Sequence, residues 1–208
     1  MKAYSYRSNP FFYQDRRIEA VIAPTQYAKD HESPIKMGKN DLEKELQGWL
    51  KDAGAIVVVG IGNPLRGDDF VGKKTVQEMR DRVPKRVCLV ECEFVPEDSI
   101  QDIADFQPTH VLVIDAALMN ESYGTVKLIT DLSLAPSNIS THTLPLQIFC
   151  GLLRNTLGAK LALLAIQPKK ISLGEGLSAE VKYSGEKVSE ILIKVFSGKK
   201  KEACHNLE

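Results

Sequence analysis

The sequence predicts a single three-layer α/β domain, in which a twisted, mostly parallel five-stranded sheet carries helices on both faces. Two observations carry this prediction. Short apolar runs rich in β-branched residues, without polar alternation, are typical of parallel strands buried on both faces. Segments with helical apolar spacing separate these runs, as in successive βαβ units with right-handed crossovers. A chain of 208 residues suits one such domain with a modest appendage.

The first expected element of the domain is a helix over Asp41–Ala53, whose leucines and Trp49 fall on one face. Asn40 is its expected N-cap, and Glu43 is placed to complete a capping box. Gly54 is expected to end the helix, because glycine readily adopts the left-handed conformation found after a last turn.

The remaining elements alternate between strands and helices. The expected strands are Ala55–Gly60, Arg86–Cys92, His110–Ile114, Gly124–Thr130 and Lys160–Ile166. Lys127 interrupts the fourth of them, which favours a place at the edge of the sheet. The expected helices are Asp69–Arg82, which stops before Pro84, and then Pro96–Asp105, Leu144–Asn155 and Ser178–Phe196.

The two ends of the chain differ from this domain. Residues 1–40 hold aromatic side chains near the start and are interrupted by Pro10, Pro24 and Pro34, so we expect an irregular extension. Residues 41–198 form the predicted domain. Residues 199–208 are expected to be a polar tail.

Composition excludes several classes of function. Lys plus Arg and Asp plus Glu both number 27, and this balance argues against a dedicated nucleic-acid binder, which needs a basic surplus. No apolar run reaches the roughly 18 residues that a membrane span needs. The first residues lack the apolar segment of a signal peptide, so we expect a cytoplasmic protein.

Polar residues follow several of the predicted strands. The segment Gly60–Asp69 (GIGNPLRGDD) comes after the first strand, and Asp115 follows the third. Ser140–Thr143 (STHT) precedes a predicted helix, and Gln167 follows the fifth strand. Ligands of doubly wound sheets bind outside the carboxyl ends of the strands. We therefore expect these four segments to meet along one edge.

The glycine-rich loop matches neither common phosphate-binding motif. A dinucleotide fingerprint would place its third glycine at Leu65, and no Gly-Lys-Ser/Thr follows to make a Walker A loop. Taken alone, Asp69 could simply cap a helix, and His142 could be an ordinary loop histidine. Asp115 is different, because a carboxylate that follows four apolar strand residues needs a partner. Together the three side chains suit a divalent metal and a polarised water or carbonyl.

At these residues the chain resembles a known family. The runs GIGNPLRGDDFVG, VLVIDAALM, STHTLPL and LLAIQP are similar to those of the hydrogenase maturation endopeptidases, which trim the C-terminus of the nickel–iron ([NiFe]) hydrogenase large subunit. The resemblance covers roughly Ile56 to Phe196. The paired aspartates and the Ile-Gln-Pro are most similar to the branch that serves formate-hydrogenlyase-type hydrogenases.

The resemblance implies a site, a metal and a partner. Asp69, Asp115 and His142 match the family's nickel-binding positions, and they are the expected catalytic residues. The nickel is expected to arrive with the substrate, the large-subunit precursor, rather than to be held permanently. The oligomeric state stays open, and a monomer would be compatible with this role.

The resemblance also implies a group of substrate-binding residues around the site. We expect the loop residues to let the substrate backbone approach closely, and the others to form hydrogen-bonding walls or support the loop. These residues are Gly62, Asn63, Gly67, Asp68, Thr141 and Gln167.

Two mechanisms and two other functions stay open at this point. Nickel could polarise the scissile carbonyl or a water, or Asp69 could act as general base. A phospho-accepting receiver domain would place acidic residues at similar strand ends, but Gln167 stands where such a domain has lysine. A non-catalytic nickel carrier could use the same ligands, although one histidine with two carboxylates makes a poor tight site for free nickel.

Overall fold

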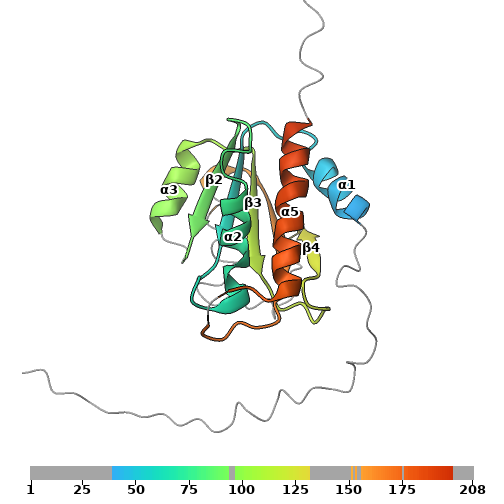
Figure 1. Cartoon of the computed structure of the whole chain (residues 1–208). Coiled ribbons are helices and arrows are strands. Elements are labelled where there is room, and N and C mark those ends of the chain that lie inside the picture. Colours follow the sequence, from blue (N-terminus) through green and yellow to red (C-terminus); the bar gives the residue numbers. More distant parts are fainter. Residues whose placement is uncertain are drawn as a thin grey trace, which may run out of the picture. The chain divides into compact units, whose positions relative to one another are not determined.

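A computed structural model describes residues 39–93, 97–131, 151, 153, 156–174 and 176–198 of the chain. This part of the protein forms three layers, with a sheet between helices, and confirms the predicted fold class (Figure 1). The expected extension lies outside the described residues except for its last two positions, and the expected tail lies wholly outside them. No described helix is long and apolar enough to cross a membrane.

The sheet contains the five strands in the order β2-β1-β3-β5-β4. Their bounds are Ile56–Ile61 for β1, Val87–Cys92 for β2, His110–Ala116 for β3, Val126–Ile129 for β4 and Lys160–Ile166 for β5. Only β4 runs antiparallel to its neighbour, and it lies at the edge, as Lys127 indicated. The carboxyl ends of the four parallel strands therefore share one edge of the sheet.

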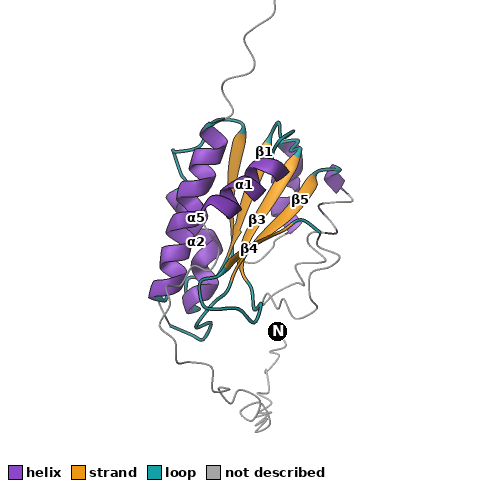
Figure 2. Ribbon diagram, turned by 90° about the vertical axis from the view of Figure 1, so that its right-hand side faces the viewer, coloured by secondary structure: helices purple, strands orange, loops and turns teal. Residues whose placement is uncertain are grey.

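The helices cover both faces of the sheet. They are α1 (Lys39–Trp49), the 3-10 turn η1 (Gly67–Phe70), α2 (Val71–Glu78), α3 (Glu97–Asp105) and α5 (Ala179–Ser197). Residues of α1, α2 and α5 share one apolar core with the sheet, and α3 contributes to the other. Figure 2 shows α2 and α5 stacked on the same side of the strands. Of the helix expected at Leu144–Asn155, the structure describes only Gly151 and Leu153.

Alternate residues of each buried strand serve the two cores. On β1, Ile56 and Val58 face the helices α1, α2 and α5, while Val57 and Val59 face the layer of α3. All four side chains are fully buried. Burial on both faces explains why these runs are continuously apolar instead of alternating with polar residues.

Three predicted boundaries were wrong. The helix expected over Asp69–Arg82 begins as the 3-10 turn η1, because Gly67 has a φ of 56° and starts a tight turn, and α2 already ends at Glu78. The helix α1 already includes Asn40, so Asn40 is not its N-cap, and it ends at Trp49 rather than at Ala53, without a left-handed Gly54. The strand β3 continues to Ala116, with Asp115 paired to Ala165 of β5. Asp115 is thus part of the strand rather than the residue after it.

Main-chain contacts between α2 and the sheet fix the position of this helix. A Cβ atom on Gly72 would lie 2.1 Å from the carbonyl oxygen of Ile114, and one on Gly60 would lie 2.4 Å from the carbonyl oxygen of Gly72. Glycine is required at both positions because the helix backbone touches the strand backbone. The start of this helical segment, which carries Asp69, is therefore held against the strand that carries Asp115.

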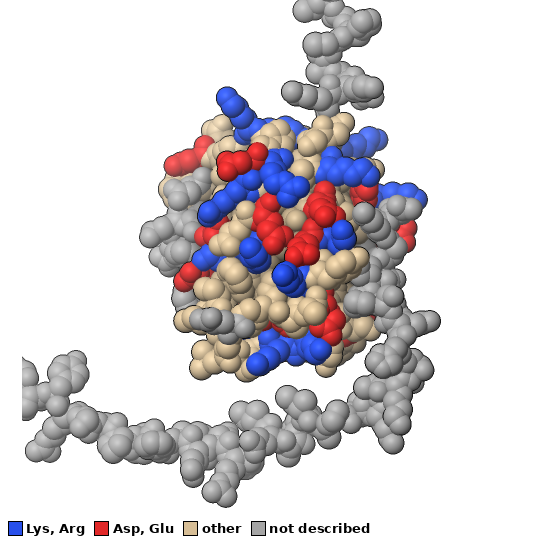
Figure 3. Space-filling model, viewed as in Figure 1, with Lys and Arg blue, Asp and Glu red and all other residues tan. Residues whose placement is uncertain are grey.

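The outer face of α2 and α5 shows no surplus of one charge. Figure 3 shows acidic and basic side chains interspersed over this face. Several of them form ion pairs, including Lys73 with Glu93 and Lys187 with Glu190. This face therefore lacks the basic surplus by which a nucleic-acid binder neutralises phosphate.

Candidate active site at the carboxyl edge of the sheet

Asp115 is a buried carboxyl group near the carboxyl end of β3. Its exposed fraction is 2%, and its Oδ2 atom has no hydrogen-bond partner among the described residues. Burial raises the pKa of Asp115 well above its usual value, and the nearby charge of Asp69 raises this pKa further. A hydrogen bond with the backbone of Ala116 opposes these effects. Within the part of the chain that the structure describes, Asp115 is thus a buried carboxyl group with one oxygen unpaired.

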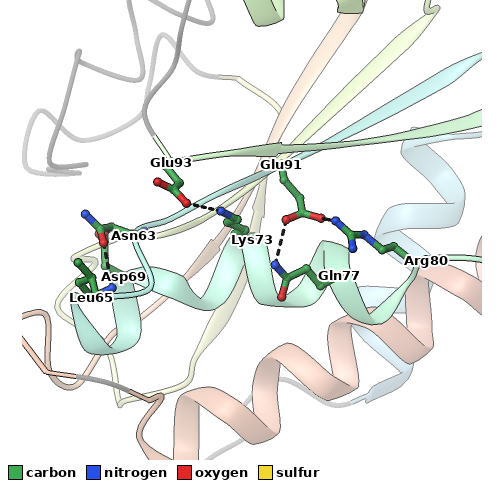
Figure 4. Close-up of polar contacts among 8 residues, drawn as sticks. All are labelled: Asn63, Leu65, Asp69, Lys73, Gln77, Arg80, Glu91 and Glu93. Atoms are coloured by element: carbon green, nitrogen blue, oxygen red, sulfur yellow. Dashed lines mark hydrogen bonds and ion pairs between the residues drawn. The ribbon is translucent and has the colours of Figure 1, made fainter.

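Asp69 lies on η1 and is half-buried. Its Oδ2 atom accepts a hydrogen bond of 3.2 Å from the backbone N–H of Asn63 (Figure 4). The side chain of Asn63 in turn accepts a hydrogen bond of 2.9 Å from the N–H of Leu65, which closes a local turn. The loop after β1 therefore holds Asp69 in place by its own backbone.

The two loop glycines allow close packing within the protein. A Cβ atom on Gly62 would lie 2.1 Å from the carbonyl oxygen of Asp69, and one on Gly67 would lie 2.7 Å from that of Lys170. These glycines therefore let the loop pack on itself and on the loop after β5. Their expected contact with a substrate backbone stays a prediction.

Asp68 ties two loops together from a fully buried position. Its carboxylate accepts hydrogen bonds from the backbone N–H groups of Lys169, Lys170 and Ser178, and from the Ser178 hydroxyl, at 2.6 to 2.9 Å. A carboxylate with these four donors and no exposed surface has no room for a substrate contact. We therefore assign Asp68 to the support of the loop.

Gln167 also supports the edge from within. Its Oε1 atom accepts a hydrogen bond of 2.6 Å from the N–H of Met119, and its Nε2 group donates to the carbonyl oxygen of Pro168. The side chain is almost fully buried. It anchors the loop that follows β3, and its expected role as a substrate-facing wall stays a prediction.

The third expected ligand, His142, lies outside the described residues, as does Thr141. The structure therefore brings together Asp69 and Asp115 of the expected set of three. Within the described ranges, no group of three His, Cys, Asp or Glu side chains is placed to hold a metal ion.

Sequence reasoning missed a polar network between α2 and β2. Glu91 pairs with Arg80 and accepts a hydrogen bond of 2.9 Å from Gln77, and Glu93 pairs with Lys73 at 2.6 Å (Figure 4). Its signature is visible in the sequence, because Lys73, Gln77 and Arg80 recur at helical spacing through α2 and just past its end, and the two glutamates alternate at strand spacing at the end of β2. The network fixes the helix that follows Asp69.

The fold and the site indicate a general class of protein before any comparison with known proteins. A doubly wound sheet with two carboxyl groups at its carboxyl edge, one of them buried with an oxygen unpaired among the described residues, is an α/β protein with a candidate active site at that edge. Comparison with known proteins then gives the family. The sequence model described as hydrogenase maturation protease matches residues 73–195, and the chain belongs to this family.

Individual relatives agree with this assignment. A curated Methanocaldococcus jannaschii protein named as a hydrogenase maturation protease is 36% identical over 162 residues, which cover 74% of this chain and 95% of that protein. The hydrogenase 3 maturation protease of Escherichia coli K12 is 25% identical over 65% of this chain and 87% of its own length. Among solved structures, a [NiFe] hydrogenase maturation protease from Thermococcus kodakarensis superimposes with a TM-score of 0.67 at 28% identity, covering 74% of this chain and 99% of that one.

Proposed function

We propose that this protein is an endopeptidase that removes the C-terminal extension of a [NiFe] hydrogenase large-subunit precursor after nickel has been inserted. Membership in the hydrogenase maturation protease family supports the activity. The observation that supports the nickel-dependent form of the proposal is the Oδ2 atom of Asp115, which is buried, has no hydrogen-bond partner among the described residues and lies within the electrostatic reach of Asp69.

The chemistry follows from the placement of the two carboxyl groups. Asp69 and Asp115, together with His142, would bind the nickel that the precursor carries. That ion would polarise the scissile carbonyl or a water molecule. Asp115 would give up its proton on binding, because a cation beside a buried carboxylate offsets the cost of its charge. Burial of Asp115 therefore favours its neutral form, without nickel bound, until the precursor brings the positively charged ion.

Asp69 has a second possible role. It is half-buried rather than fully buried, and the N–H of Asn63 fixes one of its oxygens. A carboxylate held in this way could take the proton of the attacking water as general base. The two roles predict different consequences for binding, since a ligand contributes to the affinity for the nickel-loaded precursor, whereas a general base contributes mainly to the rate.

The reaction belongs in the cytoplasm on this proposal, where the unprocessed large subunit would meet the enzyme. The two other functions have less support. A receiver module would need a lysine at position 167, but Gln167 is engaged with the loop after β3. A nickel carrier would bind the free ion tightly, which two carboxylates and one imidazole do poorly.

The test is a cleavage assay read by mass spectrometry. The purified protein is incubated with an unprocessed large subunit from the same cell, with and without nickel, beside the variants Asp69→Asn and Asp41→Asn. Asp41 is an exposed aspartate on α1 and serves as the matched control. We expect loss of a C-terminal peptide only from the nickel-loaded precursor, at least about 100-fold slower with Asp69→Asn and unchanged with Asp41→Asn.

Two other results would contradict parts of this proposal. Normal cleavage by Asp69→Asn would remove this residue from the mechanism. Equal cleavage of the nickel-free precursor would remove the metal requirement while leaving the peptidase activity in place.

A further inference from the structure

Exposed large apolar side chains gather at one edge of the molecule. Among the described residues, five such side chains are well exposed, and four of them lie on loops that follow β1, β3 or β5 at the carboxyl edge of the sheet. These four are Leu65, Leu118, Tyr123 and Leu173, and the fifth, Tyr183, lies on α5. Exposed apolar groups gathered around a site are typical of a surface that binds another polypeptide.

Leu65 and Leu173 are the most exposed of these, at 58% and 82%. They come from loops about 100 residues apart, yet backbone hydrogen bonds hold the loops together. The N–H of Gly174 donates to the carbonyl oxygen of Leu65 at 3.0 Å, and the N–H of Gly67 donates to that of Gly174 at 2.8 Å. Arg66 and Gly174 also form a parallel bridge. We call these two side chains the leucine pair.

The leucine pair is built on the same loop as the candidate catalytic carboxylate. The N–H of Leu65 donates to the Asn63 side chain, and the N–H of Asn63 donates to Asp69. Figure 4 shows Leu65 beside Asn63 and Asp69 at the start of the helical segment. The buried carboxylate of Asp68 fixes the second loop, since it accepts the N–H groups of Lys169 and Lys170. The pair is therefore held in place although its side chains are exposed.

We propose that the leucine pair binds an apolar stretch of the precursor polypeptide next to the bond that is cut. This inference rests on the proposed function, because it assigns a contact to that same substrate. A peptidase must hold the chain beside its reacting groups, and the leucine pair is the apolar surface joined most directly to Asp69.

A second copy of this chain fits the leucine pair less well. A dimer that covered this edge would block the access of a protein substrate to Asp69 and Asp115. Two leucine side chains also supply only part of the roughly 800 Å² per partner that a stable specific interface buries. A contact within a larger enzyme–substrate interface matches both observations.

The test separates substrate binding from chemistry. The kcat and KM for cleavage of the nickel-loaded precursor are measured for the native protein, for Leu65→Ser/Leu173→Ser and for Tyr183→Ser, which changes an exposed aromatic residue on α5. We expect the double variant to raise KM about tenfold with little change in kcat, and the control to leave both unchanged. Leu173→Ser alone, at the most exposed position, is expected to raise KM by a smaller factor and guards against a folding defect in the double variant.

Each other outcome overturns the inference. An unchanged KM in the double variant, with normal cleavage by the native protein, contradicts the contact and leaves the proposed function standing. A fall in kcat alone would mean that the leucines support Asp69 rather than bind substrate. A concentration-dependent dimer of the native protein that the double variant abolishes would assign the pair to a second copy. Failure of the native protein to cleave any nickel-loaded precursor overturns the proposed function and the contact with it.

Discussion

At the scale of single residues, three buried polar side chains of the carboxyl edge divide into two kinds. Asp68 and Gln167 have hydrogen-bond partners on the protein's own backbone. Asp115 has an oxygen with no such partner in the described ranges, and the nearby charge of Asp69 adds to the cost of its ionisation. The first kind stabilises the fold, whereas the second lowers stability and keeps a group available for a ligand. Stability and function therefore place opposite demands on neighbouring positions.

The carboxyl group of Asp115 should make stability depend on pH. Its folded-state pKa lies above the usual 3.8, so ionisation as the pH rises favours the unfolded chain, whereas below this value both states are protonated. The isosteric variant Asp115→Asn cannot ionise. We expect the difference in Tm between the variant and the native protein to grow in the variant's favour by at least about 2–4 °C from pH 4 to pH 7, which corresponds to roughly 1 kcal/mol.

This measurement uses calorimetry of the metal-free full chain, with Asp41→Asn as the exposed control. A pH-independent difference between Asp115→Asn and the native protein would show that Asp115 is ionised at little cost.

Asp68, in contrast to Asp115, should stabilise the folded protein. The variant Asp68→Ala removes the acceptor for three partly buried N–H groups and the Ser178 hydroxyl. Each donor left without a partner costs about 1–3 kcal/mol, so we expect the free energy of unfolding to fall by at least about 3 kcal/mol. Urea unfolding measures this, with Asp41→Ala as the control. A loss below about 1 kcal/mol would mean that other acceptors replace the carboxylate.

At the scale of elements, the position of α2 decides the geometry of the site. Its backbone touches β1 and β3 at Gly60 and Gly72, and its polar face is joined to β2 through Glu91 and Glu93. The glycines set the distance between helix and sheet, and the ion pairs set the rotation of the helix about its axis. The element that follows Asp69 is thus fixed on two sides.

The role of Gly72 can be tested against a matched glycine. A Cβ atom at Gly72 would meet the backbone of Ile114 and Ile61, so Gly72→Ala should lower the free energy of unfolding by about 2 kcal/mol or more. The same change at Gly48 of α1, where nothing lies within 4 Å, should raise it by roughly 0.5–1 kcal/mol, because alanine is the better helix former. Urea unfolding of both variants provides the comparison. Equal effects at the two positions would contradict the close contact of helix and strand.

Sequence reasoning predicted these elements well where burial dominates. The strand runs β1, β3 and β5 were placed within two residues, because strands buried on both faces must be apolar throughout. It failed at the start of α2, where Gly67 adopts a positive φ and a 3-10 turn precedes the helix. Local propensity does not reveal such a turn, because the loop after β5 packs against Gly67.

For the candidate site, too, sequence reasoning predicted one part and missed another. The proximity of Asp69 and Asp115 follows from the rule that parallel strands end at one edge. The structural role of Asp68 does not follow from this rule, because its partners Lys169 and Ser178 are about 100 residues further along the chain. An aspartate that accepts hydrogen bonds inside the protein and one that contacts substrate look the same in a sequence, and only their partners in the structure distinguish them.

At the scale of the whole molecule, a balanced net charge and a single edge site suit an enzyme that recognises one folded partner by shape and a few contacts. The fold is that of the solved maturation protease from Thermococcus kodakarensis, which this chain covers over 99% of its length.

The proposed source of the metal leads to a binding prediction. If nickel arrives with the precursor, the protein alone should bind free Ni²⁺ more weakly than about 1 μM, because carboxylates are poor ligands for this ion. Isothermal titration at pH 7 measures the affinity, with Asp115→Asn identifying any heat that comes from the site. Micromolar or tighter binding that Asp115→Asn abolishes would favour the nickel carrier.

The contact between Gly72 and Ile114 has a consequence for how such an enzyme can change. Two main-chain segments in van der Waals contact cannot approach further, whatever side chains surround them. The spacing between the backbones of α2 and β3 thus stands at a lower limit set by atomic radii. Random mutation or high pressure can widen or preserve that spacing but cannot shorten it, so laboratory evolution toward a smaller metal ion would have to work through the loops instead.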